Sequence, residues 1–115
     1  MVNEERVNDQ VDPSVLKVVG RKKSGLESKS HVRELAGAIL EVIGKYQNAK
    51  LRAVGGAAIS NAIKAIGVAQ KRFGEQSEVG DELFHQIHRI DVDFDGDIKT
   101  GSLFVVRPLS AINGE

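Results

Sequence analysis

The chain has 115 residues, of which 41% are hydrophobic and 28% charged, and this is the size and composition of one domain that buries its own core. It contains no cysteine, which excludes disulfides, thiolate metal sites and thiol nucleophiles. The formal net charge is +0, but residues 1–72 carry 13 Lys and Arg against 7 Asp and Glu, whereas residues 73–115 carry 3 against 9. This split indicates a basic binding surface beside an acidic one, complementary patches for self-association, or a chance segregation of solvated charges.

The chain begins with a polar, acidic stretch, residues 1–12, that contains no apolar run. We therefore expect no signal peptide and no membrane anchor, and we expect a cytoplasmic protein. Residues 1–13 are predicted to form a flexible leader, residues 14–109 the folded domain, and residues 110–115 a C-terminal tail.

A strand and a helix are predicted first. Residues 15–19 are short, mostly β-branched and bounded by Pro13 and Gly20, which favours a strand. A basic loop follows, and a helix is expected to begin near Ser28 or Ser30. Its apolar positions recur at helical spacing: Val32, Leu35, Ala36, Ile39, Ile43 and Tyr46.

A second strand and helix repeat this order. Residues 50–54 alternate with period two and end in Gly55 and Gly56. A second helical stripe follows, made of Ile59, Ala62, Ile63, Ile66 and Phe73. Residues 90–94 then alternate as a third strand, Asp95-Gly96 predicts a two-residue hairpin turn, and residues 98–107 form the fourth strand.

The predicted fold class is α/β, an α+β two-layer sandwich in the order β-α-β-α-β-β, with a four-stranded mixed sheet and two helices on one face. Right-handed crossovers in the same lateral direction place both helices on that face. On the first two strands the alternation places the charged side chains on a single face. We expect Arg52, Phe104 and Val106 to share the uncovered face as an interface.

The order of elements is that of Alba-like domains and of the C-terminal domain of translation initiation factor 3. Residues 51–65, LRAVGGAAISNAIKA, resemble the second strand, glycine turn and helix of the stage V sporulation protein S family within the Alba-like superfamily. Residues 16–18, 35–37 and 90–108 also resemble that family, so the resemblance covers about residues 15–108. It implies a small bacterial regulatory protein of developmental programmes such as sporulation.

The resemblance also implies nucleic-acid contacts. The basic loop after the first strand resembles the Alba loop whose lysines contact the nucleic-acid backbone, and clustered cations there would release counterions on binding. We take Arg21, Lys22, Lys23 and Lys29 as its contact residues. Gly55 and Gly56 are candidates to present backbone amides to a phosphate at a helix N-terminus, with Asn61 and Lys64 beside them; a tight turn and a solvated helix surface are the competing interpretations.

Metal binding and catalysis have little support in the sequence. Asp91, Asp93, Asp95 and Gly96 match the opening of a calcium loop, but Ser102 stands where the bidentate glutamate is required, and a solvated hairpin explains the aspartates. These aspartates would repel phosphates, unlike the basic Alba hairpin. His85 and His88 point to opposite faces of a strand, and no nucleophile, base and oxyanion donor form a recognisable set. We expect no metal, no cofactor and no enzymatic activity.

Two functions remain open at this stage. The first is a nucleic-acid-associated regulatory protein that binds DNA or RNA through its basic loop as a homodimer. The alternative is a protein-interaction or assembly module that uses the uncovered sheet face without nucleic acid. Ligand sensing at the glycine turn or the acidic hairpin ranks last.

Overall fold

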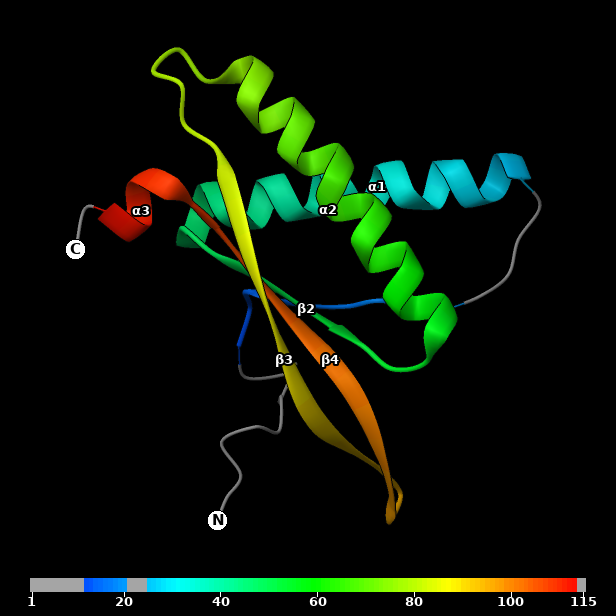
Figure 1. Cartoon of the computed structure of the whole chain (residues 1–115). Helices are drawn as coiled ribbons and strands as arrows, with labels where there is room; N and C mark the ends of the chain where they lie inside the picture. The colour runs from blue at the N-terminus through cyan, green and yellow to red at the C-terminus, as the bar shows by residue number, and fades with distance from the viewer. Residues whose placement is uncertain (1–11, 21–24, 114–115) are drawn as a thin grey trace.

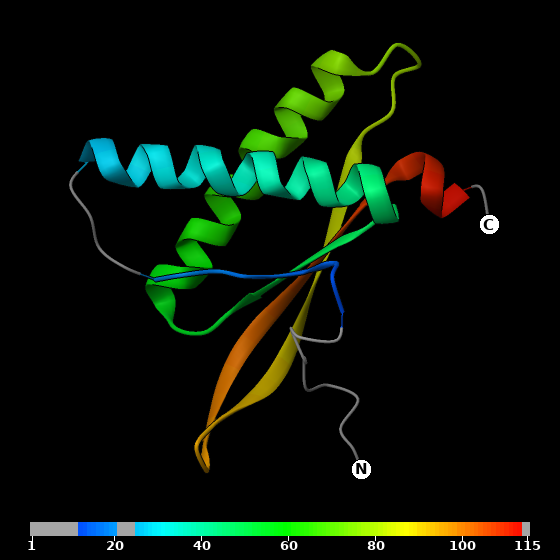
Figure 2. The same cartoon turned by 180° about the vertical axis from the view of Figure 1, so that it is seen from behind.

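The fold is a four-stranded sheet covered on one face by two long helices. The computed structural model describes residues 12–20 and 25–113, with side chains described except at 25–28 and 112–113. The elements are β1 (Val15–Lys17), α1 (Gly25–Tyr46), β2 (Ala49–Ala53), α2 (Gly56–Gln76), β3 (Leu83–Phe94), β4 (Asp97–Pro108) and α3 (Leu109–Asn113). Figures 1 and 2 show α1 and α2 on the same side of the sheet, crossing one another.

The sheet is mixed, with strand order β1-β2-β4-β3. β1 and β2 are parallel, and β4 runs antiparallel to both of its neighbours, β2 and β3. The predicted fold class, the two-layer arrangement and the placement of both helices on one face are therefore confirmed. The five-residue helix α3 was not predicted from the sequence.

The hairpin turn between β3 and β4 is the one that the sequence predicts. Asp95 and Gly96 have φ values of 55° and 90°, and Phe94 pairs with Asp97 across the turn. Positive φ at both central positions defines the primed turn that matches the twist of the strands. β3 is longer than predicted because it begins at Leu83, so the turn lies at the end of a long two-stranded ribbon that points away from the helices (Figure 1).

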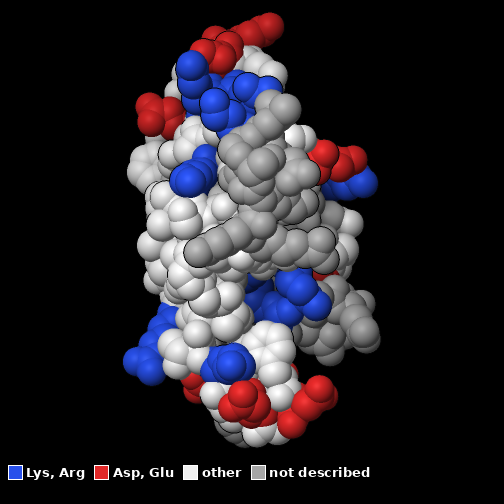
Figure 3. All heavy atoms as spheres, turned by 90° about the vertical axis from the view of Figure 1, so that its right-hand side faces the viewer, with Lys and Arg blue, Asp and Glu red and all other residues white. Residues whose placement is uncertain are grey.

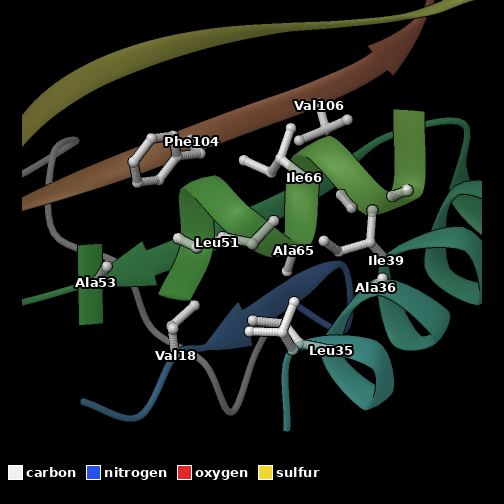
Figure 4. Close-up of a cluster of buried hydrophobic side chains, with 14 of the residues drawn as sticks. Val18, Leu35, Ala36, Ile39, Leu51, Ala53, Ala65, Ile66, Phe104 and Val106 are labelled. Carbon is white, nitrogen blue, oxygen red and sulfur yellow. The ribbon is translucent and has the colours of Figure 1, made fainter. Parts of the chain in front are cut away.

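The core lies between the helices and one face of the sheet. Leu51 is fully buried, and residues alternate between buried and half-buried along β2. Ile39 of α1 and Ile66 of α2 belong to the same apolar cluster, which Figure 4 shows together with Val18, just after β1, and residues of β2 and β4. Burying such side chains contributes about 1.5–3 kcal/mol each, so this face of the sheet is the stable centre of the molecule.

The prediction that Phe104 and Val106 lie on the uncovered face is wrong. Phe104 pairs with Leu51, and residues that face each other across two strands share a face, so both point toward the helices. Their exposed fractions are 1% and 0%, and Figure 4 shows them in the core cluster with Ile66. The run of four apolar residues in β4 concealed which alternate pair faces inward, and the register with β2 decides it.

Candidate nucleic-acid interface

A basic groove lies between α1 and α2 on the outer side of the helical layer. It has a volume of about 190 Å³. We call it the basic groove; its lining residues are Lys29, Val32, Arg33, Lys64 and Val68. Two of the contact residues predicted from sequence, one on each helix, are thus brought together, and Arg33 joins them.

Helical spacing accounts for the make-up of the groove. Lys29 and Arg33 are four residues apart in α1 and share one face, as do Lys64 and Val68 in α2. Val32 is 8% exposed and belongs to the core cluster. Val68 is partly buried and packs against that cluster. The floor of the groove is therefore apolar and anchored in the core, while the cations stand at its rims.

The cations of the groove are available to a partner. Lys29, Arg33 and Lys64 are all exposed, and none forms an ion pair with another residue of the described chain. No acidic residue is among those that line the groove. Three neighbouring cations without a counter-charge produce a local positive potential, which attracts polyanions such as a nucleic-acid backbone.

The predicted contact residues Arg21, Lys22 and Lys23 lie outside the described residues. The positions on either side of them are described. A Cβ at Gly20 would lie 2.9 Å from the backbone nitrogen of Ala58, so the end of the first strand lies directly against the first turn of α2. α1 begins at Gly25, shortly before Lys29. The basic segment is thus connected at both ends to the helices that form the groove.

The family was established by comparison with known proteins. The model of the family described as stage V sporulation protein S matches residues 25–108, which is more than half of the chain. The chain belongs to the stage V sporulation protein S family. Membership marks it as a small sporulation-related protein, and the resemblance inferred from sequence is confirmed. No curated protein matches the chain.

The part of the chain shared with the sporulation protein S family contains the whole basic groove. Lys29, Arg33 and Lys64 lie within residues 25–108, whereas the segment Arg21 to Lys23 precedes them. Arg33 was not among the residues predicted from sequence. Its position four residues after Lys29 was the available signal, since this spacing places both side chains on one helix face.

The glycine turn before α2 has a conformational explanation of its own. Gly55 is the N-cap of α2 with φ of 92°, a value that favours glycine, and no side chain caps the first turn. Gly55 and Gly56 are both exposed. Contact of their amides with a phosphate stays a prediction, and the tight turn alone accounts for the glycine at position 55.

Asn61 has a structural role in this family member. Its side chain is 8% exposed, and its amide nitrogen donates a hydrogen bond of 2.9 Å to the carbonyl oxygen of Val19. It thereby connects α2 to the end of the first strand. We leave Asn61 out of the proposed contact set, whereas Lys64, one turn further along α2, is exposed and lines the groove.

The uncovered face of the sheet, opposite α1 and α2, is also rich in cations. Lys17, Lys50 and Arg52 share this face, as the alternation predicts. Arg52 and Lys50 are half-buried, and the Nζ of Lys50 lies 3.1 Å from a carboxylate oxygen of Asp12. Of the three residues expected to form an interface, Arg52 alone lies on this face, because Phe104 and Val106 are buried in the core.

Asp12 is held by the start of the sheet. Its carboxylate accepts hydrogen bonds from the Ser14 hydroxyl at 2.6 Å and the Ser14 backbone nitrogen at 2.9 Å. These bonds, the hydroxyl first, and the contact with Lys50 lower the pKa of Asp12 from 3.8 to about 2. The carboxylate is therefore charged at neutral pH and neutralises part of the uncovered face.

The aspartates of the hairpin are explained by the turn and by exposure to solvent. Asp91, Asp93 and Asp97 are exposed, and the described residues contain no group of three or more His, Asp or Glu arranged to hold a metal ion. Asp93 accepts a hydrogen bond of 2.7 Å from the backbone nitrogen of Gly96, so it stabilises the turn.

Among the helices of the described residues, none combines the length and the apolar composition that a membrane span requires.

Proposed function

We propose that this member of the stage V sporulation protein S family is a non-enzymatic regulatory protein that binds the backbone of DNA or RNA. The single observation that supports this is the basic groove, where cations from two helices line one hollow and none of the lining residues is acidic. Backbone contacts are electrostatic and independent of sequence, and they need clustered Lys and Arg more than a deep pocket. Arg21, Lys22 and Lys23, which lie outside the described residues, are proposed as further contacts because they add three cations just before α1.

The acidic turn of the hairpin supports a particular orientation of the nucleic acid. Figure 3 shows a group of Asp and Glu atoms at the lower end of the molecule, where β3 and β4 join, and Lys and Arg atoms above them, with further Asp and Glu atoms at the upper end and on both sides. Phosphates are repelled by the carboxylates of Asp95 and Asp97 and attracted to the helical layer. The nucleic acid therefore crosses the helices and avoids the hairpin.

A salt titration of binding tests the proposal. We expect wild-type protein to bind short DNA and RNA duplexes and single strands at low salt, with affinity falling linearly on a logarithmic salt scale. Replacing Lys29, Arg33 and Lys64 by alanine removes three phosphate contacts and reduces the slope by about 3, at roughly 1 for each cation. Absence of binding at low salt contradicts the proposal.

A matched control separates the groove from overall charge. Replacing Lys45, Arg89 and Lys99 by alanine removes the same number of exposed cations from the end of α1 and from the hairpin. We expect this variant to keep the wild-type salt slope. Equal loss of binding in both variants would mean that net charge alone drives the association. A separate variant with alanine at residues 21–23 measures the contribution of the basic segment.

A second candidate function is assembly through the uncovered face. Phe84 is 46% exposed and, with Val105 and Arg107, lines a hollow of about 180 Å³ on β3 and β4. Exposed aromatic side chains and arginines are enriched in protein contacts. This alternative predicts that Phe84→Ser abolishes self-association, measured by light scattering, and that nucleic acid plays no part.

A further inference from the structure

We infer that the hairpin tip of one copy docks in the basic groove of a second copy, so that the protein associates head to tail. The hairpin tip is defined as residues 93–98. This inference rests on the same groove as the proposed function and implies that nucleic acid and the hairpin tip compete for it. The predicted homodimer is thereby replaced by an open chain of copies, because a contact between two different surfaces does not close by itself.

Charge complementarity is the first ground for this pairing. The tip carries Asp93, Asp95 and Asp97, and the Nζ of Lys99 lies 3.6 Å from a carboxylate oxygen of Asp97. Both side chains of that pair are more than half exposed, so the pair is weak. The groove presents the opposite charge without counter-ions of its own. Each surface therefore supplies what the other lacks.

Apolar surface is the second ground. Phe94 is 44% exposed and Ile98 is 49% exposed. Phe94 pairs with Asp97 and Ile98 pairs with Asp93, so the two apolar side chains lie on opposite faces of the tip. The groove has an apolar residue from each helix, Val32 and Val68. Because the tip has an apolar side chain on each face, either face can contact the apolar floor of the groove while the aspartates meet the cations at its rims.

The positions of the two surfaces allow docking between copies. Figures 1 and 2 show the turn of the hairpin projecting past the rest of the sheet, away from α1 and α2. The groove opens on the helical layer. A projecting tip and a groove at separate places on one molecule are what a repeating contact requires.

Sedimentation velocity over a range of protein concentration tests the pairing. A tip in a groove buries less than the roughly 1,200 Å² of stable interfaces, so we expect weak, reversible association. At low salt the average mass should rise continuously with concentration and pass beyond the dimer. In about 1 M salt, where the Debye length falls to about 3 Å, it should return to the monomer. A mass that stops at the dimer, or a monomer at every concentration, overturns the inference.

Charge exchange identifies the two surfaces. The tip variant D91K/D95N/D97K keeps Asp93, which accepts the hydrogen bond of the turn, and makes residues 91–99 net positive with Lys99 included. Asn at position 95 keeps the positive φ of the turn. The groove variant K29E/R33E/K64E reverses the charge of the groove. Each variant alone should lose association by about tenfold or more, and an equimolar mixture should regain it, because opposite charges meet again at both kinds of contact. Failure of the mixture to associate contradicts the pairing.

Nucleic-acid binding by the same variants separates this inference from the proposed function. The tip variant should bind nucleic acid at least as well as wild type, and added duplex should dissociate wild-type assemblies. Binding lost only in the groove variant, with a monomeric wild type, leaves the proposed function standing and removes the head-to-tail contact. Salt-dependent assembly of a protein that does not bind nucleic acid supports the head-to-tail contact and contradicts the proposed function. If Phe84→Ser abolishes assembly while the tip variant does not, the uncovered face is the interface and the inference is wrong.

Discussion

The two ends of the β3–β4 hairpin use similar residues for opposite purposes. At the base, Phe104 is 1% exposed beneath the helices. At the turn, Phe94 is 44% exposed among aspartates. Both are aromatic residues in paired strands of one ribbon, but they lie on opposite faces. Ile87 pairs with Phe104, and alternation along β3 from Ile87 places Phe94 on the face away from the helices. An apolar residue in a strand therefore supports the core or a contact with a partner according to what lies above it.

The largest expected effect comes from removing each aromatic ring. Phe104→Ala should lower the free energy of unfolding by about 3–5 kcal/mol, because it leaves a cavity in the core. Phe94→Ala should lower it by only about 1 kcal/mol, because the residue is 44% exposed and its ring is only partly buried. Urea denaturation of both variants measures the difference. Equal losses would show that the turn is as tightly packed as the base.

Glycine at the centre of the ribbon sharpens the comparison. A Cβ at Gly101 would lie 2.8 Å from Cγ2 of Val54 and 2.9 Å from the carbonyl oxygen of Ala53. Gly101→Ala should therefore destabilise the protein by about 1–3 kcal/mol, because the end of β2 must move. The matched control is Gly37→Ala in α1, where nothing lies within 4 Å and the same change should stabilise the helix by up to about 1 kcal/mol. Two changes of equal sign would contradict this account of the close approach.

A substitution in the hairpin turn should affect stability through backbone strain and not through side-chain contacts. Gly96 has φ of 90° and no atom within 4 Å of an added Cβ, so Gly96→Ala introduces backbone strain alone. We expect a loss of about 1–2 kcal/mol. Amide hydrogen exchange should show it as faster opening of residues near the turn, with the base of the hairpin still protected. Asp95→Asn, which tolerates positive φ, is the control that should leave exchange unchanged.

The smallest expected effect lies at the start of the sheet and depends on pH. The pKa of Asp12 is lowered from 3.8 to about 2 in the folded protein, so its contribution to stability is complete above about pH 4 and disappears as pH falls through about 2. Asp12→Asn should cost less than about 1 kcal/mol at pH 7, because the pair with Lys50 is partly exposed. Thermal unfolding of both proteins at pH 7 and pH 2 should show the difference only at pH 7.

The candidate site was predicted in part. Lys29 and Lys64 were expected as contact residues, and the structure places both at the basic groove. Arg33 was missed although its spacing from Lys29 was visible. Asn61 was expected beside Lys64 but is 8% exposed and hydrogen-bonded to Val19. Sequence shows which helix face a residue occupies, but it does not show which part of that face a neighbouring element covers.

The sequence by itself determined the order of the elements, the type of the hairpin turn and the family. These depend on local signals: apolar periodicity, the Asp95-Gly96 pair and a continuous stretch that resembles known relatives. Only the tertiary structure decided which face of β4 is buried and which cations meet. Leu103 to Val106 are all apolar, so the sequence allowed either Leu103 and Val105 or Phe104 and Val106 to face the helices. The pairing of Phe104 with Leu51 decides that Phe104 and Val106 do so. The groove likewise exists only because α1 and α2 cross, and the angle and position of that crossing depend on contacts between distant parts of the chain.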